Sequence, residues 1–145
     1  MTTLHLGVIE IPYGDKSGKT TGDVAEILED KYHVMEVFYE DMGAELIAKA
    51  LERSTLLTFE AVVQSGRNSD VRLTEEAEEE LEEAFKHFLS LQQMDGVVGG
   101  VPTKAALKGV NHRFKPPYAK DNPERPSFID TGQYEANFLA WCDSD

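Results

Sequence analysis

The apolar pattern of the first residues predicts a β-strand followed by a loop. Residues 4–13, LHLGVIEIPY, are mostly β-branched or apolar and contain Pro12 near their end. Such a run, bounded by a turn-forming segment, is typical of one strand. The polar residues 14–22, GDKSGKTTG, predict a loop, and Thr21 or Asp23 can then cap a helix.

A long helical period follows this loop. Apolar residues recur every three or four positions, which predicts an amphipathic helix continuing towards Val63. The stripe consists of Val24, Leu28, Tyr32, Met35, Tyr39, Met42, Leu46 and Ala50. Because this helix is long for a globular domain, we expect Gly43 to kink or divide it near Asp41-Met42-Gly43.

A second amphipathic helix is predicted after a loop at residues 65–72. Thr74 can cap it, and the pattern continues to about Gln93 with a nearly all-glutamate outer face. Its expected buried positions are Ala77, Leu81, Ala84, Phe85 and Phe88. Glycines at 96, 99 and 100 then end the pattern, and Thr103 can cap a short helix, KAALK.

These elements predict an α+β fold, a mostly helical domain with a few strands and an extended basic C-terminal arm. The body is expected at residues 1–109. Residues 110–145 form the arm and a final aromatic segment, which either completes the same domain or makes an assembly contact. The arm is irregular because prolines recur along it, at 116, 117, 123 and 126.

Charge is unevenly distributed along the chain, whose net charge is −13. Seven glutamates lie between Glu75 and Glu83, whereas residues 104–125 hold six Lys or Arg against two acids. The negative net charge argues against generic binding to nucleic-acid phosphates. An acidic body with a basic arm suits head-to-tail contact between copies, although two solvated faces would give the same pattern.

Targeting features and cysteine content set the expected compartment. No apolar run approaches the roughly 20 residues that span a bilayer, and the first residues lack a secretion-signal pattern. Cys142 is the sole cysteine, so an internal disulfide is impossible and a reducing compartment is expected.

A phosphate-binding loop is the first chemical candidate. Residues 14–20, GDKSGKT, follow a predicted strand and precede a predicted helix, as that loop requires. Only three residues separate Gly14 from the Gly18-Lys19 pair, where the motif needs four, and no apolar strand ending in aspartate follows. We therefore interpret this segment as a polar loop and keep a small phosphate-loop enzyme as a lesser alternative.

Metal and nucleophile chemistry find little support in the sequence. A metal site built on the glutamate run would need a second, inward-facing set of ligands that includes histidine, and the sequence offers none. The four histidines do not share a spacing typical of metal ligands. Cys142 has no histidine near it in sequence, and a Gly-x-Ser-x-Gly elbow is absent. We predict no catalytic residue, no metal and no cofactor.

The end of the arm is its most distinctive part. Asp130, Thr131 and Gly132 predict a tight turn or helix cap, and Gly132 permits a positive φ. Tyr134, Phe138 and Trp141 fit a short helix, whereas Tyr134 and Phe138 also fit an alternating strand. Side chains of this size need burial, either in the chain's own core or against a neighbour.

Residues 125–141, RPSFIDTGQYEANFLAW, resemble small neck or tail-completion proteins, which join head to tail in long-tailed bacteriophages. In that family a basic, proline-containing arm leads to Asp-Thr-Gly and a short apolar segment. GVPTKAALKGVNHRFK and TTGDVAEILEDKYHVMEVF, at residues 100–115 and 20–38, also resemble phage structural proteins of this size. Tyr134 stands where leucine is usual in the family.

The resemblance implies a non-enzymatic virion structural protein, a neck, tail-completion or tail-terminator subunit assembled in the host cytoplasm. It would form a homo-oligomeric ring of six or twelve copies and contact other neck, portal-side or tail-tube proteins, with no membrane partner. DNA would pass nearby without specific binding, and an acidic lumen formed by Glu75–Glu83 would let it slide.

The expected contact residues are the arm's cations Arg113, Lys115 and Arg125, the turn Asp130, Thr131 and Gly132, and the aromatics Tyr134, Phe138 and Trp141. The alternative from another class is an acidic inhibitor or decoy that binds a basic partner.

Overall fold

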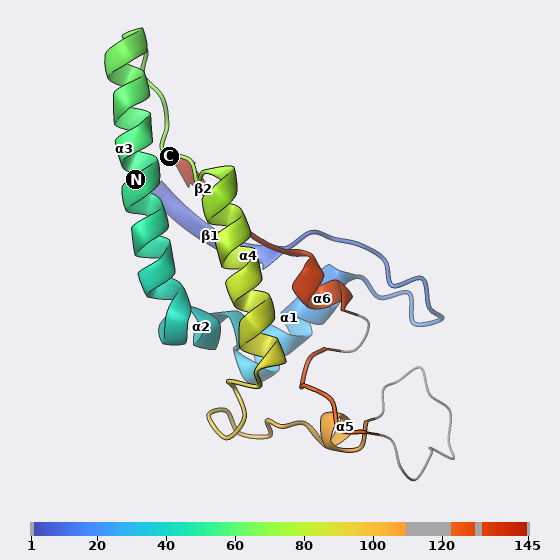
Figure 1. Cartoon of the computed structure of the whole chain (residues 1–145). Helices are drawn as coiled ribbons and strands as arrows, with labels where there is room; N and C mark the ends of the chain where they lie inside the picture. Colours follow the sequence, from blue (N-terminus) through green and yellow to red (C-terminus); the bar gives the residue numbers. More distant parts are fainter. Residues whose placement is uncertain (1, 110–122, 130–131, 145) are drawn as a thin grey trace.

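The fold is α+β and mostly helical, which confirms the predicted class (Figure 1). The computed structural model of the chain describes residues 2–109, 123–129 and 132–144. The elements are β1 (Thr2–Val8), α1 (Thr21–Tyr32), α2 (Val34–Phe38), the π-helical turn η1 (Tyr39–Gly43), α3 (Ala44–Ser65), α4 (Glu75–Ser90), α5 (Lys104–Leu107), α6 (Gln133–Ala136) and β2 (Phe138–Ser144). Among the described residues, none of the helices is both long and apolar enough to cross a membrane.

The two ends of the chain form an antiparallel two-stranded sheet. Thr2 lies opposite Ser144, and Val8 lies opposite Phe138. One face of the sheet packs on the core beside α4 and carries Leu4, Leu6, Val8, Phe138, Ala140 and Cys142. The predicted first strand ends earlier than expected, at Val8; beyond it Pro12 makes only an isolated bridge to Thr20.

The final aromatic segment is both helix and strand. α6 begins directly after Gly132, and β2 begins at Phe138. The two periodicities left open by the sequence thus apply to successive parts of the same segment.

Helix α1 begins with a capping box at Thr20, one residue before the predicted candidates. The Thr20 hydroxyl accepts from Asp23 N, and the Asp23 carboxylate accepts from Thr20 N at 2.9 Å. Thr21 is fully buried instead, and its hydroxyl donates to the Ile9 carbonyl at 2.6 Å. Asp23 therefore contributes to the cap, but as its third helical residue.

The long predicted helix changes its geometry at one place and breaks at another. At the expected place, near residues 41–43, the helix widens into the π-helical turn η1, with Gly43 packed against the Phe38 ring. An interruption that was not predicted lies at His33, whose φ of 53° ends α1 in the left-handed conformation. From Val34 to Ser65 the chain then stays helical without a break.

An aromatic cluster forms the centre of the core. Phe85 of α4 stacks on Phe138 of β2 with ring centroids 4.2 Å apart, and Phe38 meets both rings edge-on. The predicted stripe of α4 is buried at Ala77, Leu81, Phe85 and Phe88, while Ala84 is half-buried. The helix ends at Ser90, before the expected Gln93.

Candidate functional site

Helix α3 leaves the body of the protein halfway along its length. Its buried residues are Ile47, Ala50 and Ser54, all in the first half. The second half extends past the N-terminal end of α4, and the connection to α4 returns along it (Figure 1). The last three turns of α3 therefore project from the body with little cover.

The projecting half carries an uncovered apolar face. Leu56, Phe59 and Val63 are 60%, 65% and 66% exposed, and we call these three residues the apolar stripe. Their spacing of three and four places them on one side of the helix. At 100° per residue, this side is opposite the one that buries Ile47 and Ser54. Leu57, on the flank, is also exposed.

The composition of residues 54–65 indicates this face, although the sequence prediction considered a single buried stripe. A helix that covers one face of a core has polar residues on its other side. In residues 54–65, STLLTFEAVVQS, apolar residues occur all round the helix and Glu60 is the only charged one. That composition indicates a second surface to be covered.

A cavity of about 330 Å³ lies at the base of the arm; we call it the arm-base pocket. Apolar side chains from α1 form one wall, and Phe128 and Tyr134 approach from the C-terminal segment. Its lining residues are Tyr13, Asp15, Ser17, Lys19, Val24, Leu28, Tyr32, Thr103, Ala105, Arg125, Phe128, Gly132 and Tyr134.

One rim of this pocket is the loop that resembled a phosphate-binding motif. Asp15 accepts from Ser17 N and from the Ser17 hydroxyl, while Ser17 Oγ accepts from Lys19 N at 3.2 Å. Gly18 N donates to the Asp15 carbonyl. Since the backbone N–H groups of residues 17–19 all bond within the loop, they do not converge on an anion site.

Arg125, predicted to contact a neighbouring subunit, contacts its own chain. Its Nη1 donates to the carbonyls of Ile129 at 2.8 Å and Pro126 at 3.3 Å, and its backbone N donates to Ala106 O. Ser127 Oγ accepts from Thr103 N at 3.0 Å. These bonds hold residues 125–129 against α5. Arg113, Lys115, Asp130 and Thr131 lie outside the described residues.

The remaining predicted contact residues divide between core and surface. Gly132 adopts φ 80° and precedes α6, as the turn requires. Tyr134 and Phe138 are 3% and 1% exposed and packed in the chain's own core, and Tyr134 also reaches the wall of the arm-base pocket. Trp141 is the exposed aromatic of the three, and it stacks on His5 at 5.0 Å on the outer face of the sheet.

The Tyr134 hydroxyl is buried without a hydrogen-bond partner among the described residues. Burial raises the pKa of this phenol, and the nearby Glu29 and Tyr13 raise it further. Tyr134 therefore stays neutral, with its ring packed edge-on against Phe85 at 5.7 Å. This packing makes Tyr134 part of the core as well as of the pocket wall.

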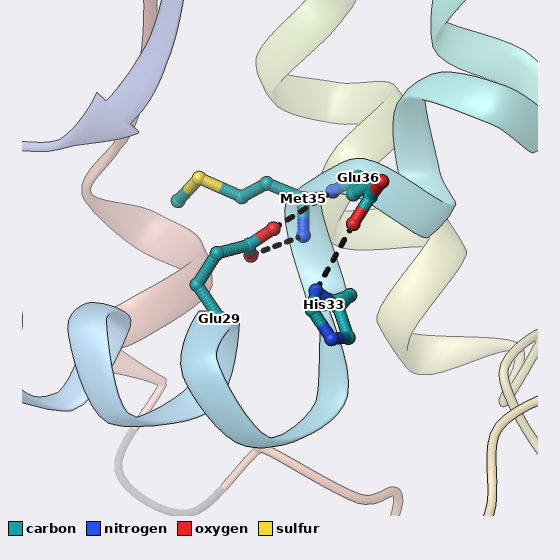
Figure 2. Close-up of polar contacts among 4 residues, drawn as sticks. All are labelled: Glu29, His33, Met35 and Glu36. Atoms are coloured by element: carbon teal, nitrogen blue, oxygen red, sulfur yellow. Dashed lines mark hydrogen bonds and ion pairs between the residues drawn. The ribbon is translucent and has the colours of Figure 1, made fainter.

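Glu29, His33 and Glu36 bring three possible ligand atoms within 4.8 Å of one another (Figure 2). No metal was predicted, and the contacts here are those of a helix cap. The Glu29 carboxylate accepts from the backbone N of Met35 at 2.8 Å and of Glu36 at 3.1 Å, which satisfies the start of α2. His33 Nδ1 lies 3.0 Å from the Glu36 carboxylate. The cluster explains why the helix can break at His33.

The glutamate face of α4 is mostly open to solvent. Glu80 and Glu83 are exposed and pair with Arg53 at 3.5 Å and Lys86 at 3.2 Å. Burial, together with neighbouring Glu82 and Glu75, raises the pKa of Glu78. Surface pairs of this kind contribute little to stability, so the face is an electrostatic feature rather than a structural one.

Comparison with known proteins returned no match. No protein-family model fits the chain, and no curated protein or solved structure is significantly similar to it. Its function must therefore be inferred from its own residues, of which the apolar stripe and the arm-base pocket are the main candidates.

Proposed function

We propose that this chain is a structural subunit of a tailed-phage virion that acts in head–tail assembly, at the neck or the tail end. The observation that carries the proposal is the uncovered apolar stripe on the projecting half of α3. A protein that works by assembly needs such a surface before it meets its neighbours, whereas a monomer's own fold gains nothing from it.

The energetic argument rests on the size of these side chains. Burying a Leu, Phe or Val side chain stabilises a protein by about 1.5–3 kcal/mol relative to leaving it exposed. Leu56, Phe59 and Val63 forgo most of this gain in the isolated chain. An assembly that covers all three recovers several kcal/mol per interface, which helps to offset the entropy lost on association.

Residues 125–141 support the same role through their resemblance to neck and tail-completion proteins. Within residues 125–141, Arg125 ties the segment to α5, Gly132 starts α6, and Phe138 closes the core. Each of these described residues has a structural contact to account for it. The resemblance of this segment to neck and tail-completion proteins is what favours the head–tail joint over other assemblies.

The acidic face of α4 fits a subunit that lines the DNA path. Glu76, Glu79, Glu80 and Glu83 are exposed on it. In a ring with this face towards the lumen, like charges would repel DNA phosphates and reduce friction. A ring with α4 turned outward would contradict this part of the proposal but not the assembly role.

A genetic experiment tests the role directly. Deleting this coding sequence from the phage genome should yield filled heads and separate tails in electron micrographs, and expressing the chain in the host should restore joined particles. Joined, infectious particles that form without the chain would refute the proposal.

A further inference from the structure

We infer that the apolar stripe of one copy docks into the arm-base pocket of the next copy, giving a head-to-tail interface. This inference rests on the proposed assembly role and names the partner as a second copy of the chain. It joins two features that the described residues leave open: a projecting apolar helix and a cavity with apolar walls.

The two features lie at opposite ends of the molecule. The projecting half of α3 is at one end, while the loop after β1 and the short helix α5, which border the pocket, are at the other (Figure 1). A contact between two different surfaces repeats from copy to copy and closes into a ring when the rotation permits. A single pair of complementary surfaces is therefore sufficient to build the assembly.

The dimensions of the pocket suit the stripe. An apolar cavity of about 150 Å³ holds a benzene molecule. The arm-base pocket measures about 330 Å³, which leaves room for the Phe59 ring and an aliphatic neighbour such as Leu56. Its walls offer Val24, Leu28 and Phe128 as apolar contacts.

Charge at the edges of the two surfaces is complementary. Glu60 lies beside the stripe on α3 and is exposed, as is Glu52, about two helical turns before Phe59. Lys19 borders the pocket and is exposed, with Lys16 next to it on the same loop. Asp15 on the same loop carries the opposite charge, and Lys16 and Lys19 together leave residues 14–20 net positive. Docking would thus place acids of one copy against a cationic pocket edge.

The apolar area of the stripe is that of a small specific interface. Leu56, Phe59 and Val63 expose 60%, 65% and 66% of their surface. Together they offer roughly 350 Å² of mainly apolar area, and since somewhat more than half of an interface is apolar, this corresponds to about 600 Å² per partner. That is about the lower end of the area that each partner contributes to a specific complex.

Mixing two defective variants tests the inference. Phe59→Glu disables the stripe and leaves the pocket intact, whereas Ala105→Trp fills the pocket and leaves the stripe intact. We expect each variant alone to lose self-association in sedimentation velocity, and an equimolar mixture to form a 1:1 dimer that grows no further. Circular dichroism verifies that both variants fold.

Leu91→Glu is the matched control because Leu91 is equally exposed but lies in neither surface. It should associate as the parent does. A mixture that stays monomeric would overturn the inference. So would an Ala105→Trp variant that associates like the parent, since the stripe would then pair with another stripe or another partner.

Charge exchange provides a second test. Glu60→Lys and Lys19→Glu should each weaken association at low salt, and the double variant should recover it. Salt should reduce the difference because exposed charges are screened. If the double variant loses as much association as the two single variants together, Glu60 and Lys19 do not contact each other across the interface.

The outcomes separate this inference from the proposed function. If purified protein associates but every variant behaves like the parent, stripe-to-pocket docking is wrong while the deletion experiment still decides the virion role. If deletion leaves heads and tails joined, the virion role is wrong while the mixing experiment still decides how copies associate.

Discussion

Phe138 offers the sharpest test of where the C-terminal segment belongs. Its side chain is 1% exposed, stacks on Phe85 at 4.2 Å and meets Phe38 edge-on at 5.8 Å. It also begins the strand β2 opposite Val8 of β1. Phe138→Ala therefore removes a core side chain and two aromatic contacts together.

The expected loss can be estimated from these contacts. Phe→Ala substitutions in cores cost about 3–5 kcal/mol, and part of this is the cavity left behind. Aromatic pairs contribute about 0.5–1.5 kcal/mol beyond area burial, so a value near the upper end is expected. Because domains are stable by only about 5–15 kcal/mol, the change should remove a large fraction of the total.

Urea unfolding followed by circular dichroism measures this loss, with Trp141→Ala as the control. Trp141 lies on the same strand but faces outward, 39% exposed and stacked on His5, so its removal should cost about 1 kcal/mol. Equal and small losses for the two variants would show that the segment is not part of the isolated chain's core.

Three further predictions concern local structure. Gly132→Val should destabilise the chain by about 1–3 kcal/mol because φ 80° is strained for a β-branched residue, and Gly132→Asn should lose less; unfolding midpoints that do not differ would count against the turn. Glu29→Ala should cost about 1–2 kcal/mol because the backbone N–H groups of Met35 and Glu36 lose their acceptor, which chemical denaturation can measure. Glu78→Gln should stabilise the chain at neutral pH. The pKa of Glu78 is raised in the fold, so the native state holds its proton more tightly and stability falls as the pH rises through that pKa. The gain from Gln should vanish in acid, where Glu78 is protonated in both states; a gain that does not depend on pH would contradict this reasoning.

Local patterns predicted the elements that depend on local chemistry. Thr74 and Thr103 cap α4 and α5 as expected, since a hydroxyl followed by a helical period is itself the signal. The buried stripe of α4 was read correctly because Phe85 and Phe88 follow the helical repeat. Gly43 likewise marked the place where the helical hydrogen bonding changes.

The break at His33 was not predictable because its cause is not local to that residue. The Glu29 carboxylate caps the next helix across the turn, which compensates for a left-handed conformation that histidine adopts at a cost of about 1–3 kcal/mol. The sequence around His33 simply continues the apolar period from Leu28 to Met35.

The two candidate surfaces differ in how far the sequence could indicate them. The arm-base pocket joins residues from 13–19, 103–105, 125–128 and 132–134, and only the folded chain brings these together. The apolar stripe was visible as Leu56, Phe59 and Val63 at helical spacing. The predicted core-facing stripe, which runs from Val24 to Ala50, was instead continued towards Val63, because the periodicity does not reveal where the body of the protein ends.

Disulfide trapping between copies tests most directly the claim that α3 of one subunit enters the pocket of the next. In a Cys142→Ser background, Leu56→Cys combined with Ala105→Cys should give a ladder of covalent multimers on mild oxidation, dispersed by reductant. Cysteines bridge only when their Cα atoms lie about 4.4–6.8 Å apart, so Leu91→Cys with Ala105→Cys should give no ladder. Absence of the first ladder in protein that self-associates, or equal ladders from both pairs, would contradict the account.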